Sequence, residues 1–527
     1  MTPEHDLLIV GGGINGTAIA RDAAKRGLSV LLCEQGDIAG ATSSASSKMI
    51  HGGLRYLEHY EFRLVAEALA EREVMLRIAP HLARPLTIVM PHVATQRPAW
   101  LIRLGLLLYD TLGRWQHPTH RPLLPTSSAL DLRQSPYAEV LQTGYPKGFA
   151  YADVLDDDAR LTLATARAAA MHGATIQPRT RLLAAQRQDQ GHGWLVRLEH
   201  HGQPRDITAR ALINAAGPWV AAVRDTCLPR QDKNGSPPPP RATVRLIKGS
   251  HIVVPRLYPG NHGWLLQNTD HRVLFVLPFE EHHTLIGTTE IPHPHLDTPP
   301  RASAAEIDYL CQAVARFFRH PPRPEDVVWH YAGVRPLHED GHHNAGDVTR
   351  DYVFELDGRP DEAPLLSIFG GKLTTHRRLA EAALDRLKPW FPQLPASTTA
   401  HHPLPGGDFT DFPQLLETLQ QRYPQLPSTL LASLARRHGS NTPAVLMDAR
   451  TPADLGQHFG GNLYAREVTY FITHEWAHTA DDILWRRSKA GLHLSAAQHQ
   501  VLGDWLATHH PELSVSTEST EPGGVPR

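Results

Sequence analysis

The chain of 527 residues is poor in cysteine. Its three cysteines, Cys33, Cys227 and Cys311, lie far apart in the sequence and form no Cys-x-x-Cys pair. This spacing excludes a disulfide framework and a zinc knuckle, and it is typical of a protein that works in the reducing cytosol.

Long apolar segments are absent as well. A transmembrane helix needs roughly 18 consecutive apolar residues, whereas the best candidate, residues 100–109, is short and interrupted by Arg103. The first residues, 1–6, are acidic and lead directly into a strand-like segment, so we expect no signal peptide. The sequence leaves attachment to a membrane surface open.

Neither sign of charge dominates. The 52 Lys and Arg against 54 Asp and Glu give a net charge of −2, which provides no overall field to attract nucleic acid. The hydrophobic share of 41% is that of an ordinary globular protein. The 34 histidines are unusual, but several occur as pairs in polar loops, where we interpret them as solvated side chains.

The first forty residues predict a βαβ unit. The apolar segment 6–10 predicts a buried strand, residues 17–26 predict a helix, and residues 29–33 predict a second strand. Gly27 follows the helix, where a left-handed backbone costs little for glycine. Such a unit is the first half of a dinucleotide-binding fold.

A glycine fingerprint lies between the first strand and the helix. Gly11 allows a tight turn, Gly13 lets a diphosphate approach the backbone, and Gly16 allows close packing of helix and strand. A carboxylate at Glu34, at the end of the second strand, can accept hydrogen bonds from a ribose and argues against the 2′-phosphate of NADP. The expected cofactor contacts of this unit are Gly11, Gly13, Ile14, Asn15, Gly16 and Glu34.

NAD and FAD share this fingerprint, and three later segments favour FAD. Residues 41–48 form a hydroxyl-rich loop that could line a phosphate and the edge of a ring. Residues 213–218 resemble the segment that approaches the cofactor from the opposite side in flavoproteins. Residues 367–375 form a strand–glycine–helix junction whose amides could stabilise a reduced flavin. The further cofactor contacts predicted from these segments are Thr42, Ser43, Ser46, Ser47, Lys48, Gly217, Gly370, Gly371, Leu373 and Thr374.

Together these segments resemble the FAD-dependent, respiratory-chain glycerol-3-phosphate dehydrogenases. The resemblance extends from Asp6 to about Leu506, and its distinctive stretches are residues 42–63, 245–254, 331–337, 349–352 and 369–375. It implies oxidation of sn-glycerol 3-phosphate to dihydroxyacetone phosphate, with electrons passing through non-covalently bound FAD to a membrane quinone (EC 1.1.5.3). It also implies a peripheral location on the cytoplasmic face of the inner membrane and allows a homodimer.

The resemblance also implies a fold and a division of the chain. The expected fold is α/β, of the glutathione-reductase/amino-acid-oxidase type, with a β-sheet substrate domain and a helical C-terminal domain. The FAD-binding part would comprise about 1–80, 150–240 and 345–400, and the substrate part about 81–149 and 241–344. The helical domain would span 401–511, followed by a disordered tail at 512–527.

Oxidation of a secondary alcohol on a flavin requires a base for the hydroxyl proton, and a phosphate dianion requires cations. His51, which follows the hydroxyl-rich loop, is the candidate base, with His251 as the rival; for His51 the alternative is a structural histidine bonded to a carbonyl. The resemblance implies catalytic roles for Arg335 and Lys372. It places further residues around the substrate, namely Arg55, Tyr56, His251, Arg350 and Thr375.

Two segments remain ambiguous. Residues 97–115 are apolar on nearly all sides if helical, which is typical of a core or dimer-contact helix or of one that lies in a membrane interface. Residues 474–478 match the zinc-protease pattern H-E-x-x-H, but no recognisable third ligand follows. We interpret this match as structural and expect no metal.

Several functions other than the quinone-linked dehydrogenase stay open. They are a glycerol-3-phosphate oxidase that uses oxygen, a related amine or amino-acid oxidase, a zinc peptidase and a non-catalytic nucleotide sensor.

Overall fold

The computed structural model describes residues 3–93, 97–116, 122–134, 136–188, 193–228, 243–270, 272–293, 295–339 and 351–514. The proline-rich segment 229–241 and Arg350 lie outside the described residues. So does most of the tail that we expected to be disordered, although residues 512–514 belong to a short helix.

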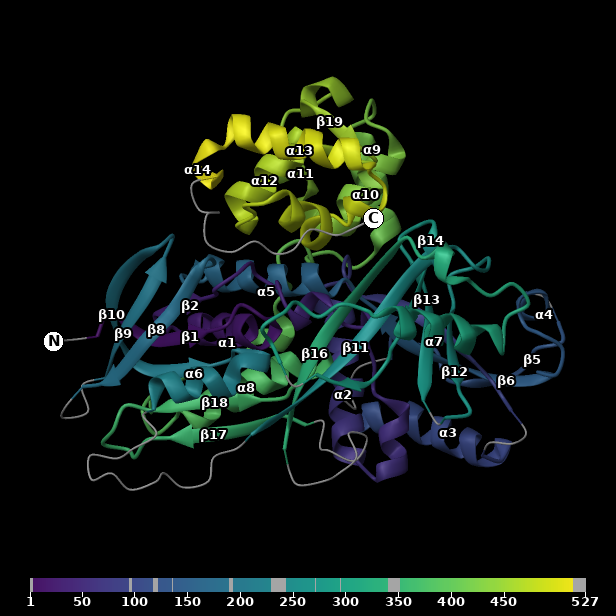
Figure 1. Ribbon diagram of the computed structural model, residues 1–527, viewed down its shortest axis with the longest axis horizontal. Helices are drawn as coiled ribbons and strands as arrows, with labels where there is room; N and C mark the ends of the chain where they lie inside the picture. Colours follow the sequence, from purple (N-terminus) through teal and green to yellow (C-terminus); the bar gives the residue numbers. More distant parts are fainter. Residues whose placement is uncertain are drawn as a thin grey trace.

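An eight-stranded sheet forms the first layer of the molecule (Figure 1). β1 lies in its middle, parallel to both β2 and β10, and β10 is in turn parallel to β18. The strands, in their order across the sheet, are β17 (Val353–Asp357), β18 (Leu365–Phe369), β10 (Gln203–Asn214), β1 (His5–Val10), β2 (Val30–Cys33) and β7 (Thr175–Gln177), with β9 (Trp194–His200) joined to β10 and β8 (Thr180–Arg187) joined to β9.

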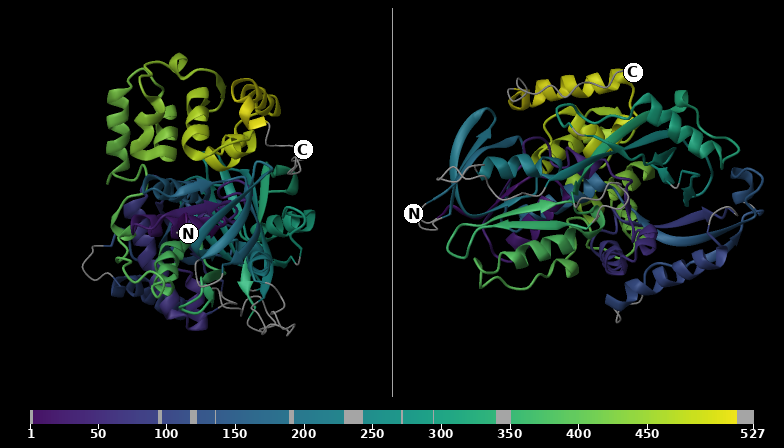
Figure 2. Two further views of the ribbon diagram at one scale, coloured as in Figure 1. Left: turned by 90° about the vertical axis from the view of Figure 1, so that its left-hand side faces the viewer. Right: turned by 60° about the horizontal axis from the view of Figure 1, so that its bottom comes forward.

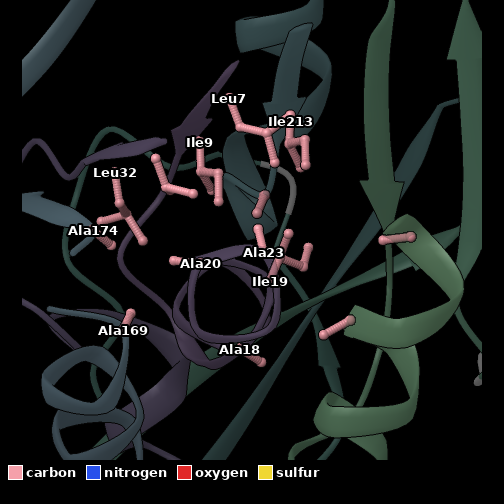
Figure 3. Close-up of a cluster of buried hydrophobic side chains, with 14 of the residues drawn as sticks. Leu7, Ile9, Ala18, Ile19, Ala20, Ala23, Leu32, Ala169, Ala174 and Ile213 are labelled. Carbon is pink, nitrogen blue, oxygen red and sulfur yellow. The ribbon is translucent and has the colours of Figure 1, made fainter. Parts of the chain in front are cut away.

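Both faces of this sheet are buried, which explains why β1 is apolar at every position. Leu7 and Ile9 point to one face and pack against α1 (Ile14–Lys25), α5 (Asp158–Met171) and α8 (His376–Arg386). Figure 3 shows Leu7 and Ile9 above the end of α1. Leu8 and Val10 point to the other face and join a core around Trp194. On this other side lies α6 (Val220–Cys227).

A ten-stranded sheet forms the second layer. Its main path runs β15 (Ile291–Pro292), β11 (Val244–Pro255), β14 (His283–Gly287), β13 (Val273–Phe279), β12 (Gly263–Gln267), β4 (Arg84–Pro91), β6 (Lys147–Leu155) and β3 (Met49–Ile50), with β16 (Trp329–His338) joined to β11 and β5 (Ser128–Asp131) joined to β6. One face packs against α2 (Phe62–Ile78) and α3 (Ala99–Gln116). The other face packs against α7 (Ala304–Ala315) and the short α4 (Tyr137–Val140).

Helices of the C-terminal part form a separate layer with its own apolar core (Figures 1 and 2). They are α9 (Phe412–Arg422), α10 (Ser428–His438), α11 (Thr442–Leu446), α12 (Ala465–Glu475), a π-helix (Asp482–Arg487), α13 (Ala496–His509) and α14 (Pro511–Ser514), and a two-stranded ribbon of β19 (His458–Gly460) and β20 (Leu463–Tyr464) joins them.

The structure corrects two of the elements that the sequence predicts. The segments 244–247 and 251–254 predict two strands, but β11 is continuous, because Lys248, Gly249 and Ser250 between them pair with β16. The segment 467–484 predicts one helix, but α12 ends at Glu475. Trp476 there has a left-handed backbone (φ 55°), which stops the helix.

Candidate active site

Four predicted site segments meet at one edge of the first sheet. Gly11 follows β1, Glu34 follows β2, Ala215 follows β10 and Gly370 follows β18. Because these four strands are parallel, their carboxyl ends point to the same side. In open α/β sheets a ligand binds outside such ends, where the chain turns to opposite sides of a central strand.

The glycine fingerprint has the tight geometry that its sequence predicts. A Cβ at Gly11, whose φ is +116°, would lie 2.5 Å from the carbonyl oxygen of Ala215. A Cβ at Gly16 would lie only 1.9 Å from the carbonyl oxygen of Gly11. Helix α1 therefore begins in direct contact with β1, and its N-terminus faces the edge where the strands end.

Glu34 holds the turn beside the fingerprint. Its two carboxylate oxygens accept hydrogen bonds from the amides of Gly12 and Gly36, each at 2.7 Å. Burial raises the pKa of the Glu34 carboxyl above its usual value, and these two amides act in the opposite direction. The carboxylate is half-buried at the end of β2, which is where a ribose hydroxyl would be bound in this type of fold.

The part of the site that lies opposite Glu34 also suits a dinucleotide. The hydroxyl of Ser43 accepts a hydrogen bond from the Ile14 amide at 2.9 Å, and Asn15 Nδ2 donates to the carbonyl of Gly370 at 3.3 Å. Asn15 Oδ1 is buried and has no hydrogen-bond partner among the described residues. A Cβ at Gly217 would meet no atom within 4 Å, so this glycine borders open space. A bound group with donors could pair with the Asn15 oxygen.

The hydroxyl-rich loop, residues 41–48, contains one correction. The sequence predicts Lys48 as a cofactor contact, but its ammonium is buried and donates to Asp158 Oδ1 at 2.7 Å and to the carbonyl of Ser44 at 3.0 Å. Asp158 also accepts from the amide and hydroxyl of Ser46. Thr42 donates to the carbonyl of Val334 at 2.6 Å. These side chains shape the loop, whereas Ser43 is the one that contacts the fingerprint.

His51 and three further candidates come together where the two sheets meet. The amide of His51 donates to the hydroxyl of Thr374 (3.3 Å), which brings the chain after β3 against the chain after β18. The ammonium of Lys372 lies 3.9 Å from the centroid of the Tyr56 ring. The imidazole of His51 is half-buried beside Phe275, with ring centroids 5.9 Å apart.

Arg335 lies on β16 and belongs to the same region. Its guanidinium is 3.2 Å from Glu290. The carbonyl of Pro336 lies 3.8 Å from the position of a Cβ on Gly370, so the chain segments that carry Arg335 and Lys372 are in contact. Two of the predicted cations thus lie on adjoining chain segments that come from different sheets.

His251 has a different environment. Its Nε2 lies 2.9 Å from the hydroxyl of Ser47, and its ring stacks on Tyr331 with centroids 4.9 Å apart. Burial, reinforced by the charges of Lys48 and Arg335, lowers the pKa of His251 to about 3. His251 is therefore neutral and ties β11 to the hydroxyl-rich loop.

The remaining predicted site residues reveal less about the chemistry of the site. Thr375 is buried, and its amide donates to the carbonyl of Lys372 at 3.2 Å. The carbonyl of Leu373 lies 2.6 Å from Nδ1 of His376. The side chain of Arg55, like Arg350, lies outside what the structure describes.

The sequence analysis missed two residues that organise the site. Asp158, at the start of α5, holds Ser46 and Lys48, and Tyr331 donates to the carbonyl of Ser46 at 2.7 Å. The segment 157–172 predicts a helix, and the run of three acids at its start, 156–158, was the available signal for the first. Tyr331 begins one of the distinctive stretches of the resemblance.

Comparison with known protein families identifies this arrangement. A family described as FAD dependent oxidoreductase matches residues 6–377, which is more than half of the chain. The chain belongs to the FAD-dependent oxidoreductase family. A second family, described as the C-terminal domain of alpha-glycerophosphate oxidase, matches residues 397–520.

Curated relatives place the chain more closely within this family. The glycerol-3-phosphate dehydrogenase of Pseudomonas aeruginosa is 48% identical over 96% of this chain and 96% of its own length. The aerobic glycerol-3-phosphate dehydrogenase of Escherichia coli is 44% identical over 96% and 97%. The D-erythritol 1-phosphate dehydrogenase of Brucella abortus is 46% identical over 95% and 97%.

A solved structure agrees with the family assignment. The glycerol-3-phosphate dehydrogenase of Bacillus halodurans in complex with FAD has a TM-score of 0.73 and 26% identity, over 98% of this chain and 92% of that chain. FAD is the cofactor of this flavoprotein, as the sequence predicts. The predicted α/β fold of the amino-acid-oxidase type is likewise confirmed.

The two histidines of the H-E-x-x-H match are not arranged as in a zinc-protease helix. Helix α12 ends at Glu475, so His474 and His478 do not share one helical face. Glu475 is fully buried and forms an ion pair with Arg160. Among the described residues no group of three or more His, Cys, Asp or Glu side chains is suited to hold a metal ion.

Proposed function

We propose that this flavoprotein oxidises sn-glycerol 3-phosphate to dihydroxyacetone phosphate and passes the electrons to a membrane quinone. The observation that carries the proposal is that Lys372 and Arg335 lie on adjoining chain segments beside the dinucleotide edge. Two cations at one site suit a phosphate dianion. The names of the Pseudomonas aeruginosa and Escherichia coli relatives support the same substrate.

The chain's own residues divide the work of the reaction. Lys372 and Arg335 bind the phosphate and fix the orientation of the alcohol carbon. The ring N5 of bound FAD would supply the acceptor for the hydride. His51 takes the hydroxyl proton, because a half-buried imidazole in the neutral form is a suitable base near neutral pH. His251 is the weaker candidate, since a group whose pKa is about 3 is a poor base at that pH.

One alternative substrate is favoured by a specific observation. The Brucella abortus relative, named for D-erythritol 1-phosphate, is 46% identical to this chain, against 48% for the Pseudomonas aeruginosa enzyme. Both substrates present a phosphate and a secondary alcohol to the same cations. Overall identity therefore does not separate them.

Anaerobic reduction of the bound flavin tests the proposal. The full-length protein is mixed with glycerol 3-phosphate or D-erythritol 1-phosphate, and loss of the flavin absorbance is followed. We expect faster bleaching with glycerol 3-phosphate, reversal by a quinone analogue and only slow reversal by air. Faster bleaching with the four-carbon substrate would reassign the substrate, and rapid reoxidation by air would make the protein an oxidase.

Helix α3 supports the membrane location that we propose. No helix among the described residues is long and apolar enough to span a membrane. Leu106, Tyr109 and Leu112 face the core, but the helix also carries a second apolar face that is exposed. This exposed face consists of Trp100, Leu101, Leu104 and Leu107. Its apolar side chains suit the boundary between lipid headgroups and acyl chains. We place the protein peripherally on the cytoplasmic side of the membrane, where the quinone is reached.

A further inference from the structure

Buried ion pairs join the helical C-terminal part to one loop of the dinucleotide site. This loop, residues 34–40, follows β2 and is called the acidic loop here because Glu34 and Asp37 lie in it. Arg487 donates from NH2 to Asp37 Oδ1 at 2.8 Å and from NH1 to Oδ2. Arg486 donates from Nε to Oδ2 of the same residue at 2.5 Å. Asp37 is 3% exposed, and the Arg487 side chain is fully buried.

A second link runs parallel to the first. Arg179 donates to Asp482 Oδ2 at 2.7 Å, and its amide donates to the carbonyl of Gly36 at 2.9 Å. Asp482 also accepts from Arg486. Burial alone would raise the pKa of Asp482, but Arg486, Arg487 and Arg179 together lower it far below its usual value. The C-terminal part therefore binds the acidic loop at Asp37 and the adjacent chain at Arg179 through ion pairs.

The acidic loop in turn contacts the fingerprint. The amide of Ala39 donates to the carbonyl of Gly12 at 3.1 Å, and a Cβ on Gly12 would lie 2.7 Å from Ile38 Cδ1. Gly12 donates its own amide to Glu34. Asp37 is thus adjacent to Ile38 and two residues from Ala39, which both contact Gly12.

The electrostatics of the acidic loop explains why the buried carboxylate of Asp37 needs the two arginines. Asp37 and Glu34 are like charges a few residues apart, and Asp37 raises the pKa of Glu34 whereas Arg179 lowers it. A buried carboxylate that loses its cations is strongly unfavourable. Without Arg486 and Arg487 the acidic loop would open to bring Asp37 to water, and Ile38 and Ala39 would leave Gly12.

We propose that Arg486 and Arg487 of the C-terminal part are positioning residues of the FAD site. Through Asp37 they hold the acidic loop in the shape that presents Glu34 to the adenosine ribose of FAD. The helical part then contributes to cofactor binding without touching the cofactor.

The test compares two flavins that differ in the half that the acidic loop contacts. Full-length protein freed of FAD is titrated with FAD and with FMN, which lacks the adenosine, and quenching of flavin fluorescence gives each Kd. For Arg487→Met we expect the affinity for FAD to fall by more than threefold, while the affinity for FMN changes less than twofold. Adding Asp37→Asn to this variant should recover part of the loss, because the unpaired carboxylate is removed.

A matched control separates this effect from general damage to the helical part. Arg437 forms a buried ion pair with Glu467 inside that part and does not reach the acidic loop, so Arg437→Met should leave the affinity for FAD within twofold. A loss of less than threefold in Arg487→Met, or an equal loss for FAD and FMN, would overturn the proposal. If Arg487→Met does not fold, Arg486→Gln, whose side chain is 18% exposed, decides by the same criteria.

Discussion

Contacts with neighbouring side chains position the cations of Lys372 and Arg335 for an anion. A ring face holds Lys372, and such contacts are worth about 0.5–2 kcal/mol. A half-buried carboxylate, Glu290, holds Arg335, and pairs of this kind contribute about 0–1 kcal/mol when solvent reaches them. A phosphate dianion would compete with these contacts for the two charges.

Removal of either cation should therefore affect turnover more than cofactor content. For Lys372→Ala and Arg335→Ala we expect kcat/KM for glycerol 3-phosphate to fall by about 30- to 1000-fold, equivalent to about 2–4 kcal/mol, with flavin absorbance per chain unchanged. The exposed Lys388, paired with Asp385 on the surface, offers a control in Lys388→Ala. A near-normal kcat/KM in either variant would refute its assignment.

His51 allows a separate test of the base. Loss of a positioned base costs about 10²–10⁴ in rate, so His51→Gln should slow anaerobic flavin reduction by that factor while FAD stays bound. His401→Gln, on the surface of the molecule, serves as the control. Flavin reduction in His51→Gln at the parent rate would show that another group takes the proton.

At the residue scale, the sequence predicted which residues occupy the turns of the site better than it predicted which partners the side chains contact. The fingerprint glycines and Glu34 were predictable because local turn geometry dictates them. The role of Lys48 was not, because its partner Asp158 stands 110 positions away. Asp37 gave no local signal at all, since both its arginines come from the other end of the chain.

Among the elements, the junction of β1 and α1 is tightly constrained. A methyl group on Gly16 would lie 1.9 Å from the carbonyl oxygen of Gly11. We expect Gly16→Ala to lower the free energy of unfolding by about 1–3 kcal/mol or more and to abolish retention of FAD.

A glycine inside α3 provides the control for this change. A Cβ on Gly105 would meet no atom within 4 Å, so Gly105→Ala should be neutral or should stabilise the protein by about 0.5–1 kcal/mol. Urea unfolding and flavin content measure both variants. A Gly16→Ala protein with normal FAD content would contradict the proposed contact of this turn with the cofactor.

The sequence predicted a helix or strand correctly where the apolar periodicity was strong. The prediction failed where contacts with a distant part of the chain determined the structure. β11 continues through the polar residues 248–250 because β16, some eighty residues later, supplies their hydrogen bonds. Helix α12 stops at Glu475 although the apolar pattern continues, because the chain turns there to bring the π-helix to Asp37.

The exposed face of α3 gives a prediction at the element scale. Replacing both Leu101 and Leu107 by Glu removes two apolar contacts, each worth about 1.5–3 kcal/mol when buried. We expect binding to vesicles that contain anionic lipid to fall at least tenfold in a sedimentation assay. Met171 and Met447 are exposed elsewhere, and their replacement by Glu is the control. An unchanged distribution of the leucine variant would exclude α3 as the contact.

At the scale of the whole molecule, buried ion pairs make the stability depend on pH. Burial alone raises the pKa of Glu467, but Arg437 and His438 lower it to about 2. Because this folded-state pKa lies below the unfolded value of 4.5, the resulting stability is complete above about pH 4.5 and disappears as the pH falls toward 2.

Glu467→Gln should therefore flatten the acid limb of the stability profile. We expect this single group to account for at most about 3 kcal/mol between pH 5 and pH 2, measured as the urea midpoint of the helical part at successive pH values. Glu325→Gln, at an exposed ion pair, should leave the slope as it is. Equal slopes in the Glu467→Gln and parent proteins would contradict the assignment.

The distance between Asp37 and Arg487 along the chain has a consequence for biosynthesis. The pair spans 450 positions, and at roughly 5–20 residues per second a ribosome needs about 20–90 s to add that length. During this time the acidic loop has been made but its cations have not. If the arginines hold the loop as proposed, nascent chains that lack them bind FAD more weakly than the finished polypeptide does.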